Sequence, residues 1–312
     1  MGPTRIAVSQ LCSLPSKAHN YALITRLASE ASSKNASMLF LPEVCSFMPS
    51  SSNETLENAE PYPDAPYLPG PGEEKAYPTL SFFSSLAASK KLWISAGSVH
   101  ESSKTQGPDG KARVYNTGLL FDPTGTLRGK YRKVHLFSID TPAVRLSEAK
   151  TTLPGDSLHV VGGTPMGSLG MAICYDLRFP YLSSSLRSSG ATTLIYPSAF
   201  TVPTGVKAWE TLLRARAIET QCFIVASAQV GEHWKGGRRS YGHSLVVGPD
   251  GSVLADAGGY DSVVEGDVED TKKDLNLYVD VGGEESVHRE RNEILQVERH
   301  TREDVANNVV FS

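Results

Sequence analysis

The sequence has no long apolar run and no surplus of basic residues. Across 312 residues, no uncharged apolar stretch approaches the roughly 20 residues that a membrane-spanning helix needs. Residues 1–11 also lack the apolar core of a secretory signal. Lys and Arg number 30 against 34 Asp and Glu, so the net charge of −4 gives no global attraction to nucleic acid or anionic lipid. We therefore expect a soluble protein with no nucleic-acid or membrane partner.

Cysteine is also scarce, and its spacing argues against a disulfide framework. The four cysteines, Cys12, Cys45, Cys174 and Cys222, lie far apart and form no CxxC pair. Scattered thiols of this kind are typical of a reducing compartment. We expect a cytoplasmic location, with the mitochondrion as a second compartment.

Motifs for metals and nucleotide cofactors are missing as well. The eight histidines contain no HExxH and no paired spacing, which argues against a zinc site. No GxGxxG fingerprint and no GxSxG elbow occurs, and the Gly-Lys pair within residues 125–131 is too close to Gly125 and is not followed by the Ser or Thr of a phosphate-binding loop. We expect chemistry without a metal or a cofactor.

Short β-branched segments alternate with segments of helical periodicity, which is typical of an α/β protein built from layered sheets and helices. A strand, a helix and a second strand span 6–43, and the same order recurs over 169–199, which predicts two facing sheets. We expect one domain over 1–312, with its core at about 4–300. The predicted strands are 5–11, 37–41, 92–99, 115–122, 169–175, 192–196, 222–228, 244–248 and 275–281.

Helices are predicted between these strands, at 16–32, 78–89, 180–189, 205–221 and about 284–295. The turn sequences at 122–125 and 249–251 predict two antiparallel hairpins. Segments 46–77 and 256–273 are predicted to be surface excursions.

Two reactive side chains follow apolar strands directly. Glu43 comes after Met38–Pro42, and Cys174 ends an apolar strand before Pro180 opens a helix. The carboxyl ends of strands in α/β sheets are where ligands bind, and a strand-to-turn junction can aim backbone N–H groups at an oxyanion. The alternatives are a solvated glutamate and a buried, inert thiol.

Lys133 and Glu148 complete a candidate catalytic set. A thiol that attacks an amide needs a base, a cation near the developing oxyanion and an acid for the departing amine, which Glu43 and Lys133 can supply to Cys174. We expect Lys133 to favour the thiolate and Glu43 to accept the proton. Lys133 lies among other basic residues, so a solvated charge cluster is the alternative for it.

Three blocks of sequence resemble, in order, the signature blocks of the nitrilase superfamily of carbon–nitrogen hydrolases. They are Leu41-Pro42-Glu43, residues 131–137 and residues 172–180. The resemblance implies a four-layer α-β-β-α sandwich that assembles as a homodimer. It also implies that Glu43 is the general base, Lys133 stabilises the tetrahedral intermediate, Cys174 forms a thioester and Glu148 supports Lys133.

Within the superfamily, residues 196–205 and 213–221 resemble the deaminated glutathione amidases and the omega-amidase, and residues 229–244 are more similar to the former. This resemblance implies a metabolite-repair amidase that releases 2-oxoglutarate and Cys-Gly. Two alternatives stay open. One is an omega-amidase acting on α-ketoglutaramate or α-ketosuccinamate, and the other is a non-catalytic binding protein on the same fold.

An α-keto acid substrate needs a partner for its carboxylate, and Arg178 can give a bidentate clamp that Lys could not reproduce. An internal salt bridge between Arg178 and Asp176 is the alternative. By resemblance, Tyr175, Phe200 and Thr204 line the same pocket, and the helix that begins near Gly205 contributes to the dimer contact. Segments 46–77 and 265–274 are longer than is usual for the family.

Overall fold

The computed structural model describes residues 3–140, 145–260, 273–282 and 287. Its main helices are α1 (Lys17–Ser33), α2 (Ser52–Glu57), α3 (Pro78–Lys90), α4 (Pro180–Ser188) and α5 (Val202–Thr220), and its 3-10 helices are η1 (Glu73–Lys75), η2 (Glu148–Lys150) and η3 (Cys174–Arg178). Most of the helix predicted at 284–295 and most of the 256–273 excursion lie outside the described residues.

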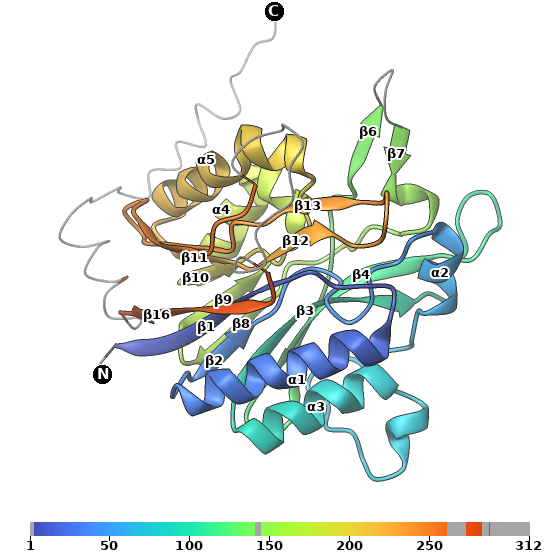
Figure 1. Ribbon diagram of the computed structural model, residues 1–312, viewed down its shortest axis with the longest axis horizontal. Coiled ribbons are helices and arrows are strands. Elements are labelled where there is room, and N and C mark those ends of the chain that lie inside the picture. The colour runs from blue at the N-terminus through green and yellow to red at the C-terminus, as the bar shows by residue number, and fades with distance from the viewer. Residues whose placement is uncertain (1–2, 141–144, 261–272, 283–286, 288–312) are drawn as a thin grey trace, which may run out of the picture.

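Two sheets form the centre of the molecule (Figure 1). The first has the order β13-β12-β1-β2-β3-β4-β5, with β16 also paired to β1, and the second has the order β15-β14-β11-β10-β9-β8. The first sheet contains β1 (Thr4–Leu11), β2 (Met38–Phe40), β3 (Trp93–Ser102), β4 (Val114–Phe121), β5 (Leu127–Arg132), β12 (Ala228–Glu232), β13 (Arg239–Tyr241) and β16 (Leu275–Val281). The second contains β8 (Val160–Thr164), β9 (Gly167–Met171), β10 (Thr193–Ile195), β11 (Phe223–Ala226), β14 (Leu245–Val247) and β15 (Val253–Asp256). A separate hairpin joins β6 (Ser138–Asp140) to β7 (Arg145–Ser147).

Alternation along the central strands separates two hydrophobic cores. Ile6 and Val8 of β1 face the second sheet and its helices α4 and α5, whereas Ala7 and Leu11 face α1 and α3. Successive side chains of a strand point to opposite faces, so one short strand serves both cores. The layers are therefore helices, sheet, sheet and helices, and the predicted α-β-β-α sandwich is confirmed (Figure 1).

Most predicted elements occur within a few residues of the expected bounds. Both predicted hairpins are confirmed, because β4 pairs antiparallel with β5 and β14 with β15. The strand predicted at 169–175 was wrong at its end, since β9 stops at Met171 and a 3-10 helix begins at Cys174. Segment 46–77 is not only an excursion, because α2 lies within it.

The strand predicted at 222–228 divides between the two sheets. β11 ends at Ala226 in the second sheet, and β12 begins at Ala228 in the first. Ser227 makes the crossing, and its Oγ donates to the carbonyl oxygen of Leu41 at 2.8 Å. Both strands are almost entirely buried, so their periodicity does not reveal the change of sheet.

The turn between β12 and β13 is held by a buried histidine. Nδ1 of His233 lies 2.8 Å from the carbonyl oxygen of Ser13, and Nε2 lies 2.8 Å from Oγ of Ser240. Burial, and then the charge of Arg238, lower the pKa of His233 from 6.5 to about 4.

This shift makes stability depend on pH. Between about pH 4 and 6.5 the unfolded chain binds more protons than the folded one, so the free energy of unfolding falls as pH is lowered through this window. Urea denaturation of His233→Gln should show lower stability at pH 7 but a loss between pH 7 and 5 that is smaller by about 2 kcal/mol. His19→Gln, on the exposed face of α1, is the control and should keep the wild-type loss; an unchanged loss in His233→Gln would contradict the assignment.

Candidate active site

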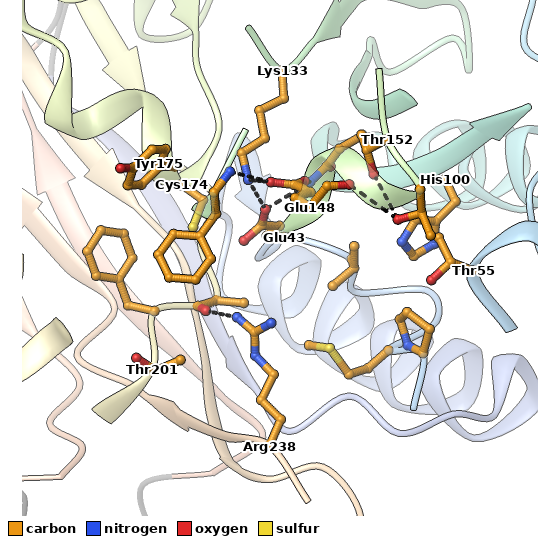
Figure 2. Close-up of a pocket in the computed structure, with 18 of the residues that line it drawn as sticks. Glu43, Thr55, His100, Lys133, Glu148, Thr152, Cys174, Tyr175, Thr201 and Arg238 are labelled. Carbon is orange, nitrogen blue, oxygen red and sulfur yellow. Dashed lines mark hydrogen bonds and ion pairs between the residues drawn. The ribbon is translucent and has the colours of Figure 1, made fainter. Parts of the chain in front are cut away.

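Four residues that are distant in sequence meet in one cavity. Nζ of Lys133 lies 3.0 Å from Oε1 of Glu43 and 3.0 Å from Oε2 of Glu148. Cys174 lines the same cavity, which encloses about 1070 Å³ including its open mouth. Figure 2 shows the Lys133 ammonium between the two carboxylates, with the Cys174 side chain beside them.

The backbone before Glu43 is fixed by a close approach to β3. Gly97, in a bulge of β3, has a φ of +61°, and a Cβ at this position would lie 1.9 Å from the carbonyl oxygen of Pro42. Only glycine allows this contact. Nε2 of Gln229 donates to the backbone oxygen of Glu43 at 2.9 Å, so the carboxylate leaves a backbone that is held from both sides.

Cys174 occupies a strained turn. Its φ is +48°, a left-handed conformation that costs energy for a residue with a side chain. Its N–H donates to the carbonyl oxygen of Pro197 at 3.0 Å. Its sulfur accepts a hydrogen bond from the backbone N–H of Ala199. Within the described chain, the N–H of Tyr175 donates to no protein acceptor, which leaves it available to a ligand.

Asp176 joins the second and third sequence blocks. Its carboxylate accepts from Oη of Tyr131 at 2.8 Å and from the backbone N–H groups of His135 and Ile173 at 2.9 and 3.0 Å. The His135 ring also lies 2.8 Å from it. With these partners Asp176 is fully buried, and among the described residues it forms no ion pair with Arg178. The salt-bridge alternative for Arg178 is therefore wrong.

Lys133 and Glu148 are also held by the backbone. The N–H of Lys133 donates to the carbonyl oxygen of Asn116 at 2.8 Å. Oε2 of Glu148 accepts from the N–H of Phe137 at 2.8 Å, which turns the first residue of η2 toward the ammonium. Lys133 is only 2% exposed, so it is not part of a solvated cluster.

Asn116 belongs to the site but was not predicted from the sequence. Its Nδ2 donates to Oε1 of Glu43 at 2.9 Å and to Oε1 of Glu148 at 3.2 Å. It therefore holds the two carboxylates in place together with Lys133. An asparagine within the apolar strand β4 was the available signal, because asparagine is depleted in strands.

Burial and neighbouring charges oppose each other at the three ionisable groups Glu43, Lys133 and Cys174. Burial alone would raise the pKa of Glu43, but Lys133, Cys174 and Arg238 together lower it. Burial would lower the pKa of Lys133, but Glu148 and Glu43 raise it well above its ordinary value. Burial and Glu43 raise the pKa of the Cys174 thiol, and Lys133 offsets only part of this effect. Lys133 thus favours the thiolate as expected, but burial and Glu43 outweigh it, so the thiol needs Glu43 to accept its proton.

The other predicted residues also line the cavity. Arg178, Tyr175, Phe200 and Thr204 are all in its wall, and Cζ of Arg178 lies 5.9 Å from the centre of the Phe200 ring. Further residues in the wall were not predicted from sequence, namely Met48, Pro49, Ser52, Thr55, His100, Thr152, Thr201 and Arg238. Figure 2 shows His100 and Thr55 on the side of Glu148 away from Tyr175. Residues 48–55 belong to the 46–77 excursion, which thus contributes to the site.

The described residues contain no group of three or more His, Cys, Asp or Glu side chains that could hold a metal ion. In the same residues, no helix is both long and apolar enough to cross a membrane.

Comparison with known proteins gives a consistent result. The carbon–nitrogen hydrolase family profile matches residues 5–271. The chain is 44% identical to the nitrilase and fragile histidine triad fusion protein NitFhit of Drosophila melanogaster over 80% of its own length, but spans about half (50%) of that protein. It is 41% identical to human deaminated glutathione amidase, over 80% of this chain and 72% of the relative.

Solved structures share the fold. Caenorhabditis elegans NitFhit superposes with a TM-score of 0.80 at 34% identity, over 98% of this chain and 66% of the other. Saccharomyces cerevisiae Nit3, of the nitrilase superfamily, gives 0.76 at 27% identity, over 96% and 97%. The profile, these relatives and the converging side chains together show that the chain belongs to the carbon–nitrogen hydrolase family.

Proposed function

We propose that the chain is an amidase that hydrolyses deaminated glutathione to 2-oxoglutarate and Cys-Gly. The observation that carries the proposal is the convergence of Cys174, Glu43, Lys133 and Glu148 in one cavity. Relatives at 38–41% identity named deaminated glutathione amidase support the choice of substrate.

In the first half of the proposed reaction, Glu43 accepts the proton of the Cys174 thiol as the sulfur attacks the amide carbon. The Lys133 ammonium and the N–H of Tyr175 stabilise the oxyanion that forms on the carbonyl oxygen. Glu43 then returns the proton to the nitrogen, the carbon–nitrogen bond breaks, and a thioester remains on Cys174.

In the second half, Glu43 takes a proton from a water molecule that attacks the thioester. The tetrahedral intermediate collapses, the acid leaves, and the Cys174 sulfur regains its proton. Glu148 keeps Lys133 in place throughout, because a buried ammonium with one carboxylate removed would be poorly compensated. No step needs a metal or a cofactor, so activity should survive treatment with a chelator.

Replacing the nucleophile provides the direct test of the reaction. With deaminated glutathione as substrate, Cys174→Ala should lower 2-oxoglutarate release by at least about 1,000-fold, because no thioester can form. Cys12→Ala, at a half-buried thiol that bonds the carbonyl oxygen of Glu232, is the matched control and should retain activity. Product formation that survives in Cys174→Ala would refute the mechanism.

The same assay separates the alternatives. A higher kcat/KM for α-ketoglutaramate than for deaminated glutathione would make the chain an omega-amidase. Absence of product from both amides in the wild-type protein would favour a non-catalytic binding protein. The intact set of Glu43, Lys133, Glu148 and Cys174 argues against that last alternative.

We propose that Arg178 binds the carboxylate of the α-keto acid. Its guanidinium lies in the cavity wall beside Phe200, and it forms no ion pair among the described residues. Tyr175, Phe200 and Thr204 would complete the pocket for this half of the substrate.

The proposed clamp can be tested by a conservative substitution. Arg178→Lys should raise KM by about 10- to 100-fold, because Lys retains the charge but not the planar pair of donors. The effect should be similar for deaminated glutathione and α-ketoglutaramate, which share this end. Arg128→Lys, at a partly exposed ion pair with Asp122, serves as the control. Unchanged kinetics in Arg178→Lys would remove it from the site.

We also propose a homodimer that forms through the outer layer of α4 and α5. Large apolar side chains are exposed there and on β15, including Tyr181 at 87% and Ile218 at 49%. The ideal Cβ of Gly251, in the turn before β15, would lie 2.6 Å from Ile218, so α5 and this turn form one surface. Continuous exposed apolar surface often marks an interface, and a two-fold axis would bury it on both copies.

Sedimentation velocity tests the proposed dimer. The wild-type protein should sediment as a dimer at micromolar concentration, and Ile218→Asp should shift it to monomer because it places charge in the apolar contact. Lys207→Asp, an exposed position of α5, controls for the charge itself. A monomeric wild-type protein would contradict the proposal.

We propose that the protein works in the cytoplasm, with the mitochondrion as the second compartment. None of its four cysteines, all within the described residues, forms a disulfide, which suits a reducing environment. Fractionation of cells that express the full chain tests this location.

A further inference from the structure

Two guanidinium groups line the cavity without a counter-charge from the protein. The carboxylates of the site, Glu43 and Glu148, are both bonded to Lys133. Among the described residues, neither Arg178 nor Arg238 forms an ion pair with any acidic side chain. The proposed function uses Arg178 for one carboxylate and leaves Arg238 without a role.

The position and the hydrogen bonds of Arg238 suit a side chain that binds a ligand. It lies in the turn between β12 and β13, and its Nη2 donates to the carbonyl oxygen of Ala199, which fixes the plane of the guanidinium. Its Nε is buried and has no hydrogen-bond partner in the described part of the chain. Figure 2 shows its side chain reaching the cavity from the side opposite Lys133. A buried, unsatisfied N–H on a cation is costly unless a ligand completes it.

The position of Arg238 relative to the catalytic groups indicates which half of the substrate it would meet. The departing nitrogen must lie near Glu43, because this carboxylate returns the proton to it. Arg238 is close enough to Glu43 to help lower the pKa of that carboxyl group. Arg238 follows β12, whose Gln229 bonds the backbone of Glu43, whereas Arg178 ends η3, which begins at Cys174. The two guanidiniums thus reach the cavity from different elements, and we assign them to different ends of the scissile amide.

The cavity also has more room than an ammonia leaving group needs. Its wall extends from Arg178 and Phe200 to Thr55 and His100, well beyond the groups that surround the scissile bond. Beyond Glu148 it continues to the uncharged side chains of Thr55, Thr152 and His100 (Figure 2). Burial lowers the pKa of His100 to about 4, so it is neutral at pH 7. Neutral donors and acceptors of this kind suit peptide groups.

Resting on the proposed amidase function, we propose that Arg238 binds a second carboxylate, carried by the leaving amine. The pocket is then built for an amide with two carboxylates, one on each side of the scissile bond. Arg178 determines the acyl half, and Arg238 determines specificity for a leaving group that ends in an acid, such as a short peptide with a free carboxyl terminus.

A cycle of two substrates and two proteins tests this role. The substrates are deaminated glutathione and the same compound with its terminal glycine carboxylate converted to an amide, and the proteins are wild type and Arg238→Met. In the wild-type protein, capping should lower kcat/KM by about 10- to 100-fold, the usual effect of losing a charge-assisted hydrogen bond. In Arg238→Met, the two substrates should have nearly equal kcat/KM.

Controls separate binding from indirect effects. Arg239→Met removes the neighbouring exposed guanidinium and should keep the wild-type preference. α-Ketoglutaramate lacks the second carboxylate, so Arg238→Met should change its kcat/KM far less than that of deaminated glutathione. An equal loss with both substrates would overturn the proposal, because Arg238 would then act through Glu43 or on the shared acyl half.

The experiment remains decisive if Arg238→Met does not fold. Equal kcat/KM for the free and capped substrates in the wild-type protein would by itself overturn the proposal. Failure of the amidase function would be recognised separately, because the wild-type protein would then release no 2-oxoglutarate from any of the three amides.

Discussion

The buried ammonium of Lys133 is the charge on which the rest of the site depends. It is nearly inaccessible to water, so it requires both Glu43 and Glu148 within hydrogen-bonding distance. Asn116 bonds the same two carboxylates and fixes their separation. Because Glu43 is ionised as a partner of Lys133, it is also ready to act as a base. The electrostatic requirement of a buried cation and the chemical requirement of a catalyst are met by one arrangement.

A further buried carboxylate, that of Asp176, supports the strained turn at Cys174. Asp176 holds Tyr131 and His135, which flank Lys133 in sequence, against the turn that begins at Cys174. The His135 ring stacks on Phe179 with a centroid distance of 3.6 Å. The nucleophile and the ammonium are therefore positioned relative to each other by Asp176, which contacts neither reacting group.

The sequence predicted two facing sheets, Glu43 and Cys174 from local signals, whereas the four-layer order and the role of Glu148 came from the family resemblance. Apolar strands that end at Glu43 and Cys174, and repeated strand-helix-strand order, can be detected without a structure. Asn116, His100 and Arg238 were missed, because their roles arise only when separate segments pack together. The crossing at Ser227 was also hidden, since burial is the same on both sides. The effect of Lys133 on the Cys174 thiol was expected, but the sequence does not show that burial and Glu43 outweigh it.

The crossing at Ser227 affects how precisely the reacting groups are spaced. Glu43 follows a strand of the first sheet, whereas Cys174 follows a strand of the second. Ser227 links the two sheets covalently, its hydroxyl bonds Leu41, and Gln229 bonds the backbone of Glu43. The gap between base and sulfur is thus set by the thickness of the apolar layer between the sheets. Buried side chains outside the cavity wall, such as Val8 and Met171, therefore influence the distance over which a proton is transferred.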